Sequence, residues 1–383
     1  MKSIAKSWLR GEPAGRDVKV ASDGREPSLV EVLLMLATIF VLHLWTLWRV
    51  RNFWDVAAFW GDNRPYLRIV DIIRNWHFSG GERPWHFWGF PYAIAGISKL
   101  FSIPGLMAVV MISMLGSLAV CILVHRLYGG WVAAAFLFMN YLWIIGSVEG
   151  GSEPLFMCLL YAAFLSVRSG RWNIAALLAS LGTTVRPVGV LALIGFAIVL
   201  IRRKSYRQLA AITLIGLAIG VLYAVPLRII LGSPFENFSA YRGDWGPQGW
   251  PLTYPLGALV PSFFTTWAEF RWPNLVMGAV WVFMALAGSV AMWLPRHREK
   301  WSMHQPEALF TSMYSLFFLS YNYSDIAYYF PRFLLPVAPL LLFSLRDWIP
   351  KDRRVLWGGA ALSALLSTAA VVGFRNVFGF RLP

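Results

Sequence analysis

Long apolar stretches, separated by short polar segments, make up most of the chain after residue 28. A helix needs about 20 apolar residues to cross a bilayer, or roughly 17 where the bilayer is thin. By this criterion the pattern predicts about eleven membrane-spanning helices, several of them short. We therefore expect an all-α, polytopic membrane protein. The predicted spans cover residues 29–48, 105–125, 131–146, 153–168, 172–185, 187–201, 208–231, 274–294, 306–322, 332–345 and 355–373.

Composition agrees with this fold class. Hydrophobic residues make up 58% of the 383 residues and charged residues 14%, with a mean hydropathy of +0.57. A soluble protein of this length needs far more polar surface. Cys121 and Cys158 both lie inside apolar stretches, so they indicate neither a disulfide framework nor a metal site. No spacing of His, Cys and Asp residues predicts a metal centre either.

The formal net charge of +15 raises nucleic acid as a partner. The basic residues, however, form short clusters between apolar stretches. This pattern is typical of topology determinants and of contact with anionic lipid headgroups. The sequence therefore predicts the lipid bilayer as a partner and argues against nucleic acid.

The basic clusters also orient the predicted helices, because cytoplasmic segments carry the denser Lys and Arg. Residues 1–28 are predicted to be a cytoplasmic tail, and 29–48 a retained first span, since it lacks the short apolar core and cleavage site of a signal peptide. Clusters such as 202–204 then also face the cytoplasm. Counting residues 87–103 as another span would place these clusters outside, so we interpret 87–103 as a helix lying in the membrane interface.

Two long loops then lie on the non-cytoplasmic face, residues 49–104 and 232–273. The second is rich in Gly, Pro and aromatic residues, as a shaped lid or acceptor groove would be. We expect residues 29–383 to form one transmembrane domain, with juxtamembrane helices and the active site in the first loop. The acidic residues of that loop are Asp55, Asp62, Asp71 and Glu82.

Asp62 is the strongest candidate for a catalytic group. It lies four positions before Tyr66, and Pro65 suits the first turn of a helix that begins near Asn63. Asp62 could simply cap this helix, but a capping side chain can also face a cleft. A carboxylate at the membrane surface could act as general base on an acceptor hydroxyl. Asp55 is the reserve candidate.

Glu149-Gly150-Gly151-Ser152-Glu153-Pro154 precedes a predicted span. Ser152, Glu153 and Pro154 make an ordinary helix start, because the helix dipole favours an acid in the first turn. An ordinary helix start does not explain why Glu149, Gly150 and Gly151 precede it. Close approach of a substrate or a metal would account for them.

Arg186 and Arg332 both lie at the ends of apolar stretches on the predicted non-cytoplasmic face. An arginine near membrane depth is costly unless it reaches the interface or pairs with an anion. One interpretation is that both side chains extend to the interface. The other is that they bind a phosphate, which a guanidinium can contact with two parallel hydrogen bonds.

Taken together, these motifs resemble the GT-C superfamily of membrane glycosyltransferases, particularly the protein O-mannosyltransferases, aminoarabinose transferases and GPI mannosyltransferases. Gly61-Asp62 with Tyr66 resembles the acidic motif of the first outer loop, although many members have an adjacent acidic pair there. Ser152-Glu153-Pro154 matches the acidic position of the second outer loop. The other matching stretches are Trp88–Tyr92, Thr184–Pro187 and Tyr328–Pro339, the last of which contains the late Arg-aromatic motif.

The resemblance implies transfer of a mannose-like sugar from a polyprenyl phosphate to an acceptor hydroxyl on a glycolipid, polysaccharide or protein. No cofactor is implied beyond this lipid-linked donor, and a divalent metal is left open. The reaction would take place on the outer face of a plasma, inner or endoplasmic reticulum membrane. Asp62 is the implied base, and the implied substrate-binding residues are Tyr66, Trp88, Glu149, Glu153, Arg186, Tyr329 and Arg332.

Two other functions are compatible with a chain of this kind. A flippase or transporter of a lipid or lipid-linked sugar would be expected to carry ionisable groups near mid-membrane, whereas the acids here gather at one face. If the protein were a non-catalytic membrane scaffold, the acids and arginines on that face would have no function. The sequence therefore favours the glycosyltransferase, with the transporter as the alternative.

Overall fold

The computed structural model describes residues 26–50, 62–78, 86–139, 141–236, 250–268, 272–294, 301, 304–323 and 326–372. Over these residues the protein is helical, and an isolated antiparallel bridge joins Leu252 to Tyr321. This confirms the predicted all-α class. Most of the predicted tail, the reserve base Asp55 and the central part of the second outer loop lie outside the described residues.

The helices follow the predicted apolar stretches closely, because each stretch is bounded by Gly, Pro or charged residues that end a helix. Within the described part of the chain, four helices are long and apolar enough to cross a membrane, namely α2, α6, α12 and α15. The bounds are α2 Leu29–Val50, α4 Asn63–Asn75, α5 Gly89–Phe101, α6 Gly105–Tyr128, α7 Gly130–Met139, α8 Tyr141–Val148, α9 Glu153–Arg168, α10 Trp172–Val185, α11 Val190–Arg202, α12 Tyr206–Leu231, α14 Leu259–Ala268, α15 Trp272–Trp293, α17 Gln305–Leu319, α18 Ile326–Phe333, α19 Ala338–Ser344 and α20 Arg353–Val372.

Two stretches that were predicted as single spans are broken. Residues 131–146 form α7 and α8, which meet at an angle of 84° and count as one further span only if the pair is taken together. Residues 332–345 are divided among the end of α18, a 3₁₀ turn and α19. Pro331, Pro336 and Pro339 fall in this segment, and proline lacks the N–H that a continuous helix would need. The second break places Arg332 beside a kink.

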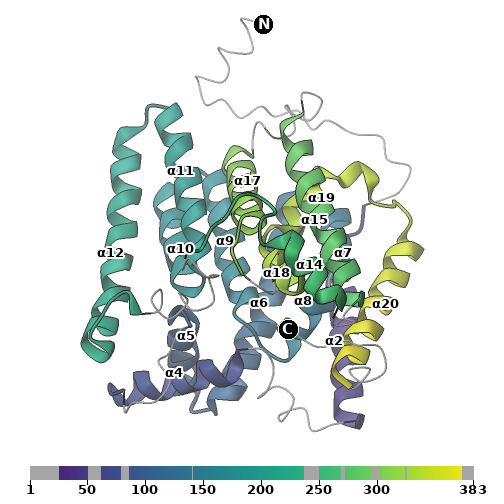
Figure 1. The fold of residues 1–383 in the computed structure, drawn as a ribbon, viewed down its shortest axis with the longest axis horizontal. Helices are drawn as coiled ribbons and strands as arrows, with labels where there is room; N and C mark the ends of the chain where they lie inside the picture. The colour runs from purple at the N-terminus through teal and green to yellow at the C-terminus, as the bar shows by residue number, and fades with distance from the viewer. Residues whose placement is uncertain are drawn as a thin grey trace, which may run out of the picture.

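The helices form one bundle, with α12 at one edge and the adjacent helices α2 and α20 at the other (Figure 1). Much of α12 exposes apolar side chains, among them Leu222 and Ile229, which are 68% and 67% exposed. A helix with so much exposed apolar surface is suited to lipid rather than to water. Membrane contact is therefore supported by the fold as well as by composition.

Helices α4 and α5 lie together at one end of the bundle (Figure 1). Each has 13 residues, too few to cross a bilayer, and α5 occupies the stretch predicted to lie in the interface. Helix α5 also packs against α10 so closely that a side chain at Gly89 would collide with Thr184. The start of α5 thus lies against the turn that carries Arg186.

Candidate active site

Asp62 immediately precedes helix α4, but its side chain makes no capping hydrogen bond. One carboxylate oxygen, Oδ2, lies 2.9 Å from Nη2 of Arg332. The other, Oδ1, lies 3.1 Å from Nε2 of His86. Both carboxylate oxygens of Asp62 therefore contact residues outside α4. Its side chain is not a simple helix cap.

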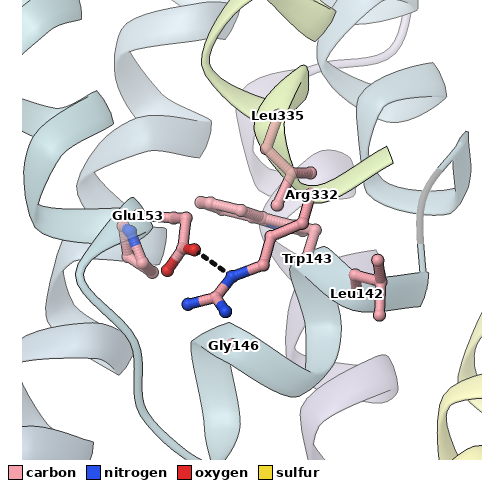
Figure 2. A pocket seen from close by; sticks show the side chains of 7 residues that line it. Leu142, Trp143, Gly146, Glu153, Arg332 and Leu335 are labelled. Atoms are coloured by element: carbon pink, nitrogen blue, oxygen red, sulfur yellow. Dashed lines mark hydrogen bonds and ion pairs between the residues drawn. The ribbon is translucent and has the colours of Figure 1, made fainter. Parts of the chain in front are cut away.

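Glu153, the first residue of α9, is nearly buried and contacts two arginines through one oxygen. Nε of Arg332 lies 2.5 Å from Oε1 of Glu153 (Figure 2), and Nη2 of Arg186 reaches the same atom. Arg186 also donates from Nε to the hydroxyl of Ser152 at 3.2 Å. Two arginines that are 146 positions apart in the sequence thus meet at one carboxylate.

Arg332 bridges the two acids, because its guanidinium pairs with Asp62 on one side and with Glu153 on the other. With Arg186, the cluster holds two carboxylates and two guanidinium groups, so its formal charges cancel. Such buried charges are stable only when they are paired, because their removal from water is costly. We call Asp62, Glu153, Arg186 and Arg332 the four-charge cluster.

The charges around Asp62 determine its protonation. Burial opposes ionisation of the carboxyl group, but the Arg332 guanidinium and the hydrogen bond from His86 outweigh it and hold the pKa of Asp62 well below its usual range. Asp62 is thus a carboxylate, and a weak base for as long as Arg332 stays beside it. Moving the Arg332 charge away would remove the largest influence that lowers this pKa, and the pKa of Asp62 would rise.

Tyr66 joins α4 to the start of α9. Its hydroxyl donates to Oγ of Ser152 at 3.1 Å, and its ring makes edge contacts with His86 and Phe90. Burial, followed by the negative charge of Asp62, raises the pKa of Tyr66 above its usual range, so the phenol stays protonated. The predicted pairing of Asp62 and Tyr66 on one side of α4 therefore brings both residues to the same cluster.

The turn between α8 and α9 holds the cluster in place. The carbonyl of Glu149 accepts a hydrogen bond from the side-chain amide of Asn63 at 2.9 Å. The backbone N–H of Gly151 donates to Ser113 of α6 at 3.0 Å, and the Ser113 hydroxyl donates back to the Gly151 carbonyl at 2.9 Å. Gly150, which helix capping did not explain, lets α4 and α6 approach this turn closely, whereas a Cβ atom on Gly151 would meet the side chain of Glu153.

Substituting Gly150 by Ala should destabilise this turn. Gly150 has a φ of +107°, and a Cβ atom there would collide with Val109 and come within 3.0 Å of the Asn63 amide. Backbone strain alone costs about 1–3 kcal/mol, so we expect a lower melting temperature and a misplaced Glu153. Gly170→Ala is the matched control, because Gly170 has a φ of +72° with open space around it at the other end of α9. Equal thermal shifts for the two variants in detergent would contradict the prediction.

The other predicted site residues, Trp88, Tyr329 and Glu149, contact residues outside the four-charge cluster. Trp88 is fully buried before α5, where it packs with Ile69 and Leu227, and its backbone N–H donates to the Tyr223 hydroxyl at 3.2 Å. Tyr329, on α18, stacks on Phe333 with 6.0 Å between ring centroids. The side chain of Glu149 points to His43 of α2 rather than to the arginines, with 2.9 Å between Oε1 and Nε2.

A small cavity lies against the four-charge cluster, lined by Glu153, Arg332, Trp143 and Gly146 (Figure 2). It is about the size of one water molecule. A sugar phosphate is much larger, so such a ligand would have to displace side chains to bind here. Arg332 lines this cavity and pairs with both Asp62 and Glu153. A bound phosphate could therefore replace either carboxylate as its partner.

No protein-family model, curated protein or solved structure matches this chain. The resemblance to the GT-C superfamily therefore rests on the motifs themselves and stays a prediction. Among the described residues, no group of three His, Cys, Asp or Glu side chains could hold a metal ion.

Sequence reasoning missed two histidines. The contact of His86 with Asp62 follows from the packing of α5 against α4, which no local pattern in the sequence shows. His43 lies inside the apolar stretch of α2, and it is completely buried. A polar residue within a predicted span is a signal of function, and it could have directed attention to His43.

Proposed function

We propose that this chain is an inverting glycosyltransferase of the GT-C type that uses a polyprenyl-phosphate sugar, with about eleven spans and its active site on the non-cytoplasmic face. The observation that carries the proposal is the convergence of Arg186 and Arg332 on Glu153, with Asp62 on the other side of Arg332. A guanidinium group can bind a phosphate with two parallel hydrogen bonds. Arg186 and Arg332 both lie at the ends of apolar helices. A lipid-linked phosphate is the substrate class that fits both features.

The proposed reaction begins when Asp62 takes the proton from an acceptor hydroxyl. The acceptor oxygen then forms a bond to the anomeric carbon, from the face opposite the phosphate. The bond between this carbon and the phosphate oxygen breaks, and polyprenyl phosphate leaves with the electron pair. Its developing charge needs stabilisation by Arg186 and Arg332 rather than a proton.

Binding of the donor would also prepare the base. A phosphate that pairs with Arg332 competes with Asp62 and Glu153 for the same guanidinium. Once the Arg332 charge is shared with phosphate, its effect on Asp62 is weaker, and burial raises the pKa of the carboxyl group. Asp62 would then be a stronger base when donor is present.

A panel of synthetic polyprenyl-phosphate sugars tests this function. Wild-type protein in nanodiscs is expected to release polyprenyl phosphate from at least one donor in the presence of an acceptor extract, and to give a product with inverted anomeric configuration. Retention of configuration would contradict direct attack by the acceptor. An absence of release from every donor, by protein that is correctly folded, would overturn the proposal.

One observation favours the alternative, a transporter of lipid-linked sugar. The His43 and Glu149 pair is fully buried and partly belongs to α2, one of the four helices that could cross a membrane. Ionisable groups at such positions are common in transport pathways. Movement of a fluorescent polyprenyl-phosphate sugar across proteoliposomes, without release of polyprenyl phosphate, would support the transporter over the enzyme.

A further inference from the structure

A second cluster of polar side chains lies behind the four-charge cluster, where α2, α20 and the turn before α9 meet. His43 contacts Glu149 through Nε2, at 2.9 Å from Oε1, and Ser367 through Nδ1, at 3.0 Å from Oγ. All three side chains are fully buried. They come from segments that are far apart in the sequence, so their meeting is a product of the fold.

The distances indicate one proton between His43 and Glu149. Oγ of Ser367 lies 2.9 Å from the carbonyl oxygen of Ala364 and 3.0 Å from Nδ1 of His43, so its hydroxyl can donate to either atom. A proton must lie between Nε2 and Oε1 of Glu149, because a lone pair facing a carboxylate at this distance would be repulsive. His43 and Glu149 therefore share one proton, whichever atom carries it, and both ring nitrogens are fixed.

Glu149 connects this pair to the four-charge cluster through the backbone. The carbonyl of Glu149 holds Asn63, which is adjacent to Asp62. Four residues after Glu149, the same turn supplies Glu153 to Arg186 and Arg332. A shift of this turn would therefore displace both the Glu153 carboxylate and Asn63, the first residue of α4.

We propose that His43 is a positioning residue for the candidate active site, and that it acts by holding Glu149 and thereby the turn formed by residues 149–153. Its effect on turnover rests on the proposed function, whereas its effect on the turn does not. Misplacement of reacting groups by about 1 Å can slow an enzyme by about a hundredfold. In the proposed role, His43 and Glu149 do not contact the reacting atoms.

The decisive variant replaces both members, as His43→Leu with Glu149→Leu. A single replacement would leave one buried polar group without its partner and could prevent folding, whereas removal of both partners can be nearly neutral for stability. We expect a melting temperature close to wild type, a kcat lowered about tenfold to a hundredfold, and a KM for donor changed by less than about threefold. Backbone amides of residues 149–153 should exchange hydrogen faster than in the wild type.

Two conservative variants provide matched controls. Gln places its amide nitrogen where Nε2 of His lies, and Asn places it where Nδ1 lies. His43→Gln should therefore keep the contact with Glu149 and retain both kcat and slow exchange, whereas His43→Asn should keep only the contact with Ser367 and lose both. This comparison decides the role of His43 even if the double variant does not fold.

The outcomes separate the two proposals. Wild-type turnover and wild-type exchange in the double variant, or equal behaviour of the Gln and Asn variants, would show that the pair only fills space and would overturn the inference. If the wild type releases no polyprenyl phosphate from any donor, the proposed function fails. The exchange rates of residues 149–153 would still decide whether His43 positions the turn.

Discussion

Asp62→Asn is expected to slow the release of polyprenyl phosphate by about a hundredfold or more, while the donor binds at least as tightly as it does to the wild type. Asparagine has nearly the shape of aspartate but cannot accept a proton from the acceptor hydroxyl. It also removes the negative charge that competes with phosphate for Arg332. Loss of turnover with unchanged or tighter binding would separate a base from a binding residue, in an assay that measures both quantities in the same nanodiscs.

Asp71→Asn is the matched control for this prediction. Asp71 lies on α4, the helix that follows Asp62, and its side chain is exposed to solvent. The substitution removes one negative charge, as Asp62→Asn does, without touching the four-charge cluster, so turnover should remain within about twofold of wild type. Normal turnover in Asp62→Asn would show that the base is another group.

The positions of the helices could be predicted from the sequence because each is set by local pattern. Helix α9 coincides with the predicted stretch 153–168, and α4 begins at Asn63 as the placement of Pro65 indicated. The breaks were harder to place, because apolar residues continue across them. The bend between α7 and α8 has no proline in the sequence around it, so the local pattern does not mark it.

The candidate site was only partly predictable, for a physical reason. Spacing in the sequence could relate Asp62 to Tyr66 because Asp62 is at the start of α4 and Tyr66 lies in its first turn. No local pattern could show that Arg332 would lie between Asp62 and Glu153, since that depends on the packing of α18 against α8 and the start of α9. The side chain of Glu149 illustrates the same limit, because it turns toward α2 although its neighbour Glu153 faces the arginines.

Arg332→Gln should have two separable effects. Glu153 and Asp62 would both lose a cationic partner, and removal of one member of a buried ion pair destabilises a protein by about 3–5 kcal/mol. The leaving phosphate would also lose a positive charge, so we expect kcat/KM to fall by about a thousandfold. Thermal unfolding in detergent measures the first effect, and donor turnover measures the second.

A second substitution separates stability from catalysis. Arg332→Gln combined with Glu153→Gln leaves two neutral amides that can hydrogen-bond to each other, but it also removes the carboxylate that pairs with Arg186, so only part of the lost stability should return. Turnover should remain low, because an amide supplies no charge to the leaving phosphate. If turnover returned together with stability, Arg332 would be a structural residue and would have no part in phosphate binding.

The ion pair of Arg168 and Glu307 provides the reference for both effects. Nε of Arg168 lies 3.1 Å from Oε1 of the buried Glu307, and Arg168 is at the opposite end of α9 from Glu153. Arg168→Gln should therefore lower stability in the same way as Arg332→Gln but leave turnover per folded molecule near that of the wild type. A fall in turnover at both ends of α9 would indicate a general effect of destabilisation, whereas a fall at Arg332 alone would assign phosphate binding to the four-charge cluster.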